Sequence, residues 1–438
     1  GFLEMSGSTT NLGSSFTEGS GTVEYDGTSS QTIFNTTYNN LVIDQNSTKI
    51  ASANLDVDGN LTIDNSATLD MSASNYNLTI DGNYTLTSGT FTSRTGTVTF
   101  NGAGAQSLTP GSSSFYNLST ATDNTDLTLQ ADITVTNDLT IAGNTTLDVG
   151  SNRGITVGGN FANSGTFTDQ QGTVTFNGTG TLTSNGNEFY NVTTSGTGTV
   201  TLGDALTIAN DLTIGANTTL DISGGNYSIG VKGNWANSGT FTQATGTVTF
   251  NGSAAQTISG TNTFYDLTIN NTHLSSKVSA NGSSLTVQDD LLISDGIFES
   301  ASDYVDVTIS AGTTLELTGN ITVSGDWSNS GTFTPSTNTV TFDGGVAQSL
   351  TSGGSSFYDL STATASTAVT IQDALVVSND LTIAASTTLD AGSDQAISVG
   401  GDWDNSGTFT SASNTVTFNG RETHQLPRGL HLQVYQFR

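Results

Sequence analysis

One seven-residue segment, Gly-Thr-Val-Thr-Phe-Asn-Gly at residues 96–102, returns almost unchanged along the whole chain. Its copies, the first of them divergent, start at residues 21, 96, 172, 246, 338 and 414, so the successive steps are 75, 76, 74, 92 and 76 residues. A long period of this kind indicates one structural unit stacked on itself. We therefore expect a repeat architecture rather than a series of unrelated domains.

The spacing of apolar residues within the unit predicts β-strands almost everywhere. In Thr97–Phe100, polar and apolar residues alternate, which places Val98 and Phe100 on one face of a strand and Thr97 and Thr99 on the other. Asn-Gly, Ser-Gly and Gly-Asn pairs separate such runs and are typical of tight turns. No stretch shows helical apolar spacing, so the chain is expected to be all-β.

Short strands with tight turns at a fixed period favour a parallel, right-handed β-helix, also called a β-solenoid. A unit of about 76 residues fits about four coils of roughly 19 residues each. The longer step of 92 residues predicts one extra coil near residues 294–317. We expect one continuous β-solenoid over residues 1–420, followed by an atypical, non-repeat tail at 421–438 that contains Arg, His and Pro.

The repeat also has a recognisable style. A glycine, an Asn or Asp and an aromatic residue open the unit, Asn-Ser-Gly-Thr-Phe follows, and a Gln-Ser/Thr-Leu/Ile segment comes after the seven-residue motif. The run 233–260, followed by Phe-Tyr-Asp-Leu at 264–267, resembles the repeats of very large bacterial surface and secreted proteins, which are similar to filamentous-haemagglutinin-type β-helical adhesins. The resemblance covers about residues 5–420 and implies a stalk or fibre.

The charge balance excludes two classes of partner. The chain has 38 acidic residues against 8 Lys and Arg, a formal net charge of −30. Nucleic-acid binding requires clustered cations, and so does docking on an anionic membrane surface. No apolar run approaches the roughly 18 residues of a membrane helix. We expect no nucleic-acid partner and no membrane insertion.

One acidic segment has the ligand types of a calcium loop: Asp56, Asp58, Asn60 and, further on, Asp64. The position of Asn60 is filled by Asp in other repeats, each time just before a strand that begins with Leu: Asp138, Asp211, Asp290 and Asp380. Such a residue is typical of a turn in which its side chain bonds nearby backbone N–H groups. We favour the turn, with calcium as the alternative, and expect no other cofactor.

The sequence offers no catalytic constellation. His273 is the only histidine before residue 424, and the basic residues up to residue 420 are scattered singly. The adjacent carboxylates Asp289 and Asp290 point to opposite faces of a strand, whereas glycoside hydrolysis requires two that face each other. We assign no catalytic residue and expect that the protein is not an enzyme.

Two recurring patterns could form binding faces. The Thr-x-Thr pairs, such as Thr97 and Thr99, would suit an ice-binding face, and Trp235, Trp327 and Trp403 would suit a sugar-binding stripe. Both recur about once in four coils, too sparsely for a continuous face. Outward strand threonines and aromatic core packing are the favoured interpretations.

These observations favour an extracellular or cell-surface, non-catalytic structural protein, a rod segment of a fibre, filament or sheath. The first alternative is an adhesin stalk with a ligand-binding tip, which could lie at 294–317. The second is a β-helix that binds or processes polysaccharide. The expected partners are other copies of the chain, joined end to end, and a surface polysaccharide.

Overall fold

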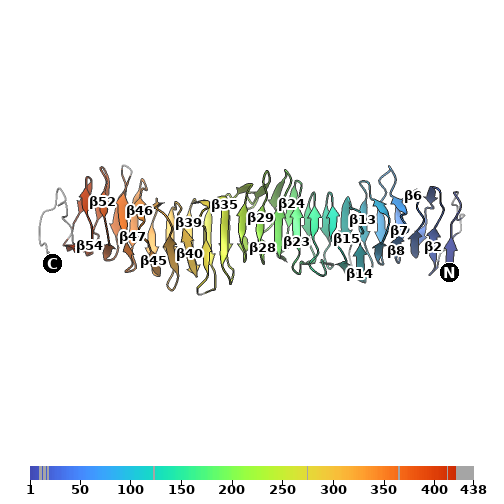
Figure 1. The fold of residues 1–438 in the computed structure, drawn as a ribbon, viewed down its shortest axis with the longest axis horizontal. Helices are drawn as coiled ribbons and strands as arrows, with labels where there is room; N and C mark the ends of the chain where they lie inside the picture. The colour runs from blue at the N-terminus through green and yellow to red at the C-terminus, as the bar shows by residue number, and fades with distance from the viewer. Residues whose placement is uncertain are drawn as a thin grey trace. The chain divides into compact units, whose positions relative to one another are not determined.

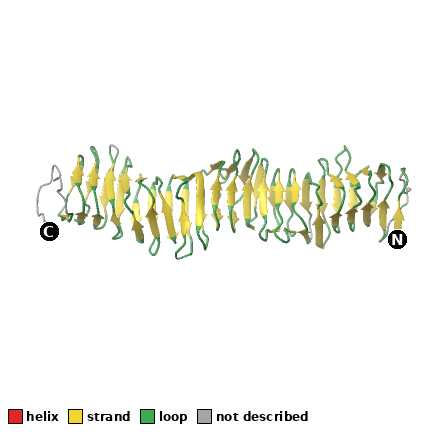
Figure 2. Cartoon of the chain, viewed as in Figure 1, coloured by secondary structure: helices red, strands yellow, loops and turns green. Residues whose placement is uncertain are grey.

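The computed structural model describes residues 1–8, 12, 16, 19–121, 124–273, 275–363, 366–411 and 413–420. The predicted tail at 421–438 lies outside these residues. Every element in the described part of the chain is a β-strand, and none is a helix that could span a membrane (Figures 1 and 2). The chain divides into two units, Gly1–Tyr227 and Ser228–Arg438. Each is a stack of parallel strands, which confirms the predicted all-β solenoid.

In the first unit the strands form the three sides of successive coils. One sheet contains β1 (Phe2–Glu4), β2 (Thr22–Tyr25), β5 (Asn40–Ile43), β8 (Leu61–Ile63), β11 (Tyr84–Leu86), β14 (Gly104–Thr109), β16 (Thr125–Leu129), β19 (Thr146–Asp148) and β22 (Thr166–Thr168). A second contains β4 (Thr37–Tyr38), β7 (Leu55–Val57), β10 (Leu78–Ile80), β13 (Thr97–Phe100), β15 (Asn117–Thr120), β18 (Leu139–Ile141), β21 (Phe161–Asn163), β24 (Gly180–Thr183), β27 (Thr199–Leu202) and β30 (Thr219–Asp221). The remaining sheets contain β3 (Gln31–Ile33), β6 (Thr48–Ala51), β9 (Thr68–Asp70) and β12 (Thr90–Thr92); then β17 (Ile133–Val135), β20 (Ile155–Val157), β23 (Thr173–Phe176), β26 (Asn191–Thr194) and β29 (Leu212–Ile214); and β25 (Glu188–Phe189) with β28 (Leu206–Ile208).

The second unit is built in the same way. Its longest sheet contains β31 (Ile229–Val231), β34 (Thr247–Phe250), β36 (Asp266–Asn270), β39 (Asp290–Asp295), β41 (Asp306–Ile309), β44 (Trp327–Asn329), β47 (Ala347–Thr351), β50 (Ala368–Ile371), β53 (Thr388–Asp390) and β56 (Thr408–Thr410). Another contains β32 (Trp235–Asn237), β35 (Gln256–Phe264), β37 (Lys277–Ser279), β40 (Ile297–Ser300), β42 (Thr314–Leu317) and β45 (Thr332–Thr334), and β38 (Ser284–Val287) also pairs with β35. A third sheet contains β43 (Ile321–Val323), β46 (Thr339–Phe342), β49 (Asp359–Thr362), β52 (Leu381–Ile383) and β55 (Trp403–Asn405). A fourth contains β48 (Ser356–Phe357), β51 (Leu375–Val377), β54 (Ile397–Val399) and β57 (Val416–Phe418). The unit also contains β33 (Thr240–Thr242).

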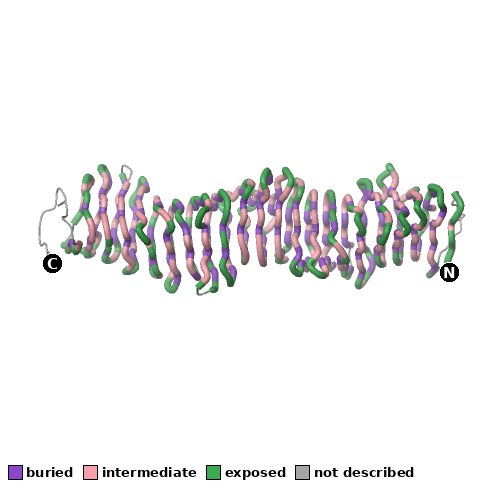
Figure 3. The backbone as a smooth tube through the Cα atoms, viewed as in Figure 1, coloured by how far each residue is buried: buried purple, intermediate pink, exposed green. Residues whose placement is uncertain are grey.

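The core lies inside the coils, as the alternation predicts. In β13, Val98 and Phe100 are buried, whereas Thr97 and Thr99 are half-buried on the outer surface. The same is true of the matching Val and Phe residues in the later copies of the motif, at 174 and 176, 248 and 250, 340 and 342, and 416 and 418. Figure 3 shows this as buried positions that alternate with half-buried ones along the strands. The apolar residues are few, but nearly all of them contribute to burial.

The sequence repeat is shorter than four full coils. Following the strand register from Val98 in β13 through four coils leads to Leu182, beyond Val174, where the next copy of the motif lies. The motif therefore moves to another side of the coil in each repeat. In the first unit its copies are β2, β13 and β23, which belong to three different sheets. In the second unit its copies are β34, β46 and β57, which also belong to three different sheets.

A steric constraint explains why the motif ends in glycine. A Cβ atom at Gly178 would lie 2.0 Å from the carbonyl oxygen of Gly158, in the preceding coil, and one at Gly344 would lie 2.0 Å from that of Ser324. No side chain fits at such a distance, so the turn after the strand accepts only glycine.

Residues 294–317, where the sequence analysis expects an extra coil, contain β40, β41 and β42. Strand β40 pairs with both β37 and β42, and β41 pairs with both β39 and β44, so two sides of the coil are continuous with their neighbours. The third side is reduced to two isolated bridges, Thr286 with Asp303 and Tyr304 with Val323. This interruption of a sheet matters for the site described below.

Candidate functional site

The calcium candidates are used for structural hydrogen bonds. Asp56 lies exposed on β7 and accepts a bond from Thr37 Oγ1 at 3.3 Å, while Asp64 accepts from Ser88 Oγ at 2.6 Å and from the N–H of Asn65 at 2.8 Å. Burial and the neighbouring Asp58 raise the pKa of Asp56, whereas the bond from Ser88 lowers the pKa of Asp64. Within the described ranges no group of three or more His, Cys, Asp or Glu side chains is arranged to hold a metal ion.

The aligned Asn and Asp residues form ladders between coils. Asn60 Oδ1 accepts the backbone N–H of Asn83 at 2.8 Å, and Asp380 Oδ1 accepts that of Asp402 at 2.8 Å. The expected partners were nearby backbone N–H groups; the partners are backbone N–H groups, and they lie in the next coil. Further rungs are Asn40 to the N–H of Asn60, Asp138 to Asn160, Asn160 to Thr181, Asp306 to Asp326 and Asp326 to Ser349.

Buried glutamines bond both to their own turn and to the backbone of the preceding coil. The Nε2 atom of Gln256 donates to the carbonyl oxygens of Val231 at 2.9 Å and Gly233 at 2.7 Å, while its Oε1 accepts the N–H of Gly252 at 3.0 Å. Gln31 and Gln348 make the same bonds in their repeats. Each amide satisfies groups that a turn would otherwise leave unpaired in the interior.

The recurring aromatic residues are packed inside the coils. Trp235 is fully buried, its ring centroid lies 4.9 Å from that of Phe241 and 5.2 Å from that of Phe264, and its Nε1 donates to Asn262 Oδ1 at 2.7 Å. Trp327 and Trp403 are equally buried. These tryptophans therefore cannot stack on a sugar, and core packing is the correct interpretation.

Several charged residues are paired in ways that the sequence did not reveal. Lys277 on β37 bonds to Glu299 at 3.3 Å and also to Glu316, which links three successive coils. His273 accepts two backbone N–H groups, those of Ser275 and Ser276, through its Nδ1 atom, which is a turn role.

Asp169 is the most perturbed carboxylate in the described part of the chain. It is 4% exposed, its Oδ1 atom has no hydrogen-bond partner, and burial raises its pKa to about 7, an effect opposed by the bond from the Tyr190 N–H. It occupies the turn position that Ser93 fills in the preceding repeat. The sequence analysis missed this residue, since nothing in a single Asp within a polar turn signals its burial.

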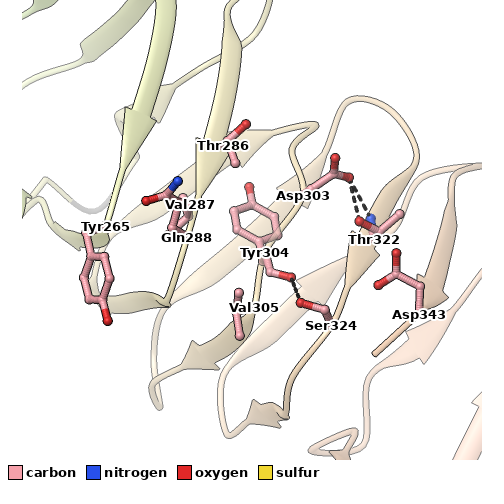
Figure 4. Close-up of a pocket in the computed structure, with 10 residues that line it drawn as sticks. All are labelled: Tyr265, Thr286, Val287, Gln288, Asp303, Tyr304, Val305, Thr322, Ser324 and Asp343. Atoms are coloured by element: carbon pink, nitrogen blue, oxygen red, sulfur yellow. Dashed lines mark hydrogen bonds between the residues drawn. The ribbon is translucent and has the colours of Figure 1, made fainter. Parts of the chain in front are cut away.

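An open groove of about 480 Å³ lies where the sheet between β38 and β43 is interrupted (Figure 4). The register places Tyr265, Gln288, Val305, Ser324 and Asp343 side by side on five successive coils. A second row beside it contains Thr286, Asp303 and Thr322. All of these residues belong to the second unit.

The two carboxylates of the groove differ in their contacts. Asp303 Oδ1 accepts the side-chain hydroxyl of Thr322 at 2.7 Å and its N–H at 3.3 Å. Asp343 Oδ1 is buried and has no hydrogen-bond partner, and burial together with the negative charge of Asp303 raises the pKa of Asp343. The 92-residue step is the only sequence signal for this region, and no pattern in it identifies the lining residues.

Comparison of the chain with known proteins identifies no relative. No protein-family model, no curated protein and no solved structure matches the chain. The fold and the geometry of these sites are therefore the basis for the function proposed next.

Proposed function

We propose that this chain is a non-catalytic structural protein, a β-solenoid segment of an extracellular fibre, filament or sheath. The observation that carries the proposal is the use of the recurring polar side chains. The Asn and Asp ladders and the buried glutamines all bond one coil to the next, in addition to the backbone ladder. Bonds between coils lie along the direction in which strands stack, so they resist separation of the coils.

The repeat pattern of the sequence supports an extracellular location. The repeats resemble those of filamentous-haemagglutinin-type adhesins, and the outer surface is rich in Thr, Ser and Asn with few cations. Immunogold labelling of intact source cells with an antibody to the chain tests this point. Label on surface fibres is expected, and label confined to the cytoplasm would contradict the proposal.

A mechanical measurement tests the structural role directly. Pulling the protein by its two ends in a force spectrometer should give a series of yielding steps, each the length of one or a few coils. The double variant Gln256→Leu, Gln348→Leu should yield at lower force, because each substitution removes the buried side-chain bonds to two carbonyl groups of the preceding coil. Yielding at the same low force in both proteins would remove the support for this role.

The proposal includes end-to-end contact between copies. Strand β1 pairs only with β2 among the described strands, and it exposes Phe2 and Leu3 by 61% and 37%. Such an edge favours the addition of another strand, whether from a second copy or from further chain of the same protein. Light scattering should show concentration-dependent growth that Phe2→Lys reduces; a monodisperse monomer at high concentration and high salt would exclude self-assembly through this edge.

An adhesin stalk is the second candidate function, favoured by the groove at the extra coil. Its lining of two tyrosines, several hydroxyl and amide groups and two carboxylates suits a polar ligand. The nature of that ligand is developed below.

A further inference from the structure

The groove beside Tyr265 combines a shape and a charge that the rest of the repeat does not explain. It follows the direction in which coils stack, since its first row takes one outward side chain from each of five coils. Successive coils are about 4.8 Å apart. A groove of this kind suits an extended chain molecule that lies along the stack.

The charge of the groove is purely negative. Asp303 and Asp343 are its only charged lining residues, and the negative charge of Asp303 adds to burial in raising the pKa of Asp343. The buried Oδ1 atom of Asp343 lacks a partner, and a buried acceptor without a donor is unfavourable. This oxygen is out of reach of a ligand, but Asp343 as a whole is half-buried and Asp303 lies beside it in the groove lining. A ligand with cationic N–H donors would offset the negative charge of these two carboxylates.

The backbone of the groove argues against a peptide ligand. The N–H groups of Gln288, Tyr304 and Ser324 already donate to carbonyl oxygens of neighbouring coils at 2.9, 3.0 and 3.0 Å. An extended peptide that adds to a sheet requires free backbone groups, and these are occupied. The side chains that face the groove are instead hydroxyls and an amide, which bond well to sugar hydroxyls.

Tyr265 lies at one end of the groove, beside Gln288 (Figure 4). Its ring is half-buried, so part of it remains in contact with solvent. An aromatic ring in this position offers an apolar face to one ring of a sugar and attracts a nearby cation.

We propose that this groove binds an oligosaccharide with protonated amino groups, such as a β-linked glucosamine chain. Its ammonium groups contact Asp303 and Asp343, its hydroxyls bond to the Thr, Ser and Gln side chains, and one sugar ring packs on Tyr265. This binding goes beyond the proposed structural role and does not depend on it.

Calorimetric titration of the full chain with a β-linked glucosamine hexamer tests the proposal. Acetylation removes the positive charge, so the N-acetylated hexamer should bind at least about tenfold more weakly, since one bond to a charged group contributes on the order of 1.5–3 kcal/mol. Asp303→Asn and Asp343→Asn should each weaken binding of the glucosamine hexamer by about tenfold or more, and Tyr265→Ala should weaken binding of both sugars.

The matched control is Asp404→Asn, an exposed carboxylate on β55 of the same unit, and it should leave the affinity unchanged. Thermal melts of all variants by circular dichroism show whether each remains folded. No measurable binding, equal binding of the two hexamers, or equal weakening by Asp404→Asn would overturn the proposal. Tighter binding of a lysine hexamer than of the glucosamine hexamer would overturn it in favour of a basic peptide.

Discussion

The backbone N–H of Tyr190 donates to the Oδ2 atom of Asp169 at 2.7 Å, in the place where the N–H of Tyr116 donates to Ser93 Oγ at 3.1 Å. The two side chains hold the same bond between coils. The difference is that a serine is neutral, whereas Asp169 introduces a charge at a site that is 4% exposed. One repeat thus contains a natural substitution whose electrostatic effect can be measured.

Asp169 should make the stability of the fold fall as the pH rises. Its pKa is about 7 in the folded protein against an ordinary value of 3.8, so between these values the folded state binds more protons than the unfolded state. The contribution is therefore intact below about pH 4, declines through about pH 7 and is lost above it. Asp169→Ser should stabilise the protein at pH 8 by on the order of 2–4 kcal/mol and have little effect at pH 4.

Urea unfolding at several pH values, followed by circular dichroism, measures this difference. The control is Asp126→Ser, which removes an exposed carboxylate from β16. If the two variants showed the same dependence on pH, the burial of Asp169 would not be the cause.

Two adjacent glycines provide a test of the contact between coils. Gly344→Ala places a Cβ atom 2.0 Å from the carbonyl oxygen of Ser324, whereas Gly345→Ala meets no atom within 4 Å. We expect Gly344→Ala to destabilise the fold by about 3 kcal/mol or more, and Gly345→Ala to change it by less than about 0.5 kcal/mol. Melting temperatures of the two variants decide the matter, and equal values would mean that the coils separate easily at this turn.

Replacement of a buried glutamine by an apolar residue should lower the stability of the fold. Gln348→Leu leaves the carbonyl oxygen of Gly325 and the N–H of Gly344 without partners, while the carbonyl oxygen of Val323 keeps the N–H of Asp343 as a donor. We expect a loss of about 2 kcal/mol or more, because each buried orphan group costs about 1–3 kcal/mol. The exposed Gln372→Leu serves as control and should change little. A tolerated Gln348→Leu would indicate that water reaches these groups.

Calcium should have little effect on the stability of the protein. Asn60 and Asp64 already accept hydrogen bonds through their side-chain oxygens, so binding a cation there would have to break them. Melting curves in a chelator and in millimolar calcium are expected to coincide. A clear rise in melting temperature with calcium, lost in Asp56→Asn, would show that the loop is a metal site.

The sequence predicted the architecture well because the architecture depends on period. Alternation in segments such as Thr97–Phe100 decides which side chains face the core, and the glycines mark the turns. The number of coils per repeat was slightly overestimated, since a repeat length divided by a typical coil length does not reveal the register. The register follows from pairs such as Val98 with Leu118, which lie far apart in sequence.

The sites were harder to predict because they depend on which residues of neighbouring coils lie next to each other. Asn60 was correctly assigned a hydrogen-bonding role, but its partner, Asn83, is a full coil away. The burial of Asp169 and the meeting of Asp303 with Asp343 likewise arise from stacking. A single sequence contains no direct signal for such pairs.

The movement of the motif to a new side in each repeat has a consequence for recognition. A receptor or antibody that binds one copy of the motif finds the other copies of that unit facing in different directions, so it cannot attach in a row along one side. Duplication of the repeat therefore adds length without creating a continuous stripe of identical epitopes. A protein of this kind can therefore become longer by duplication of the repeat without presenting a row of identical binding sites on one side.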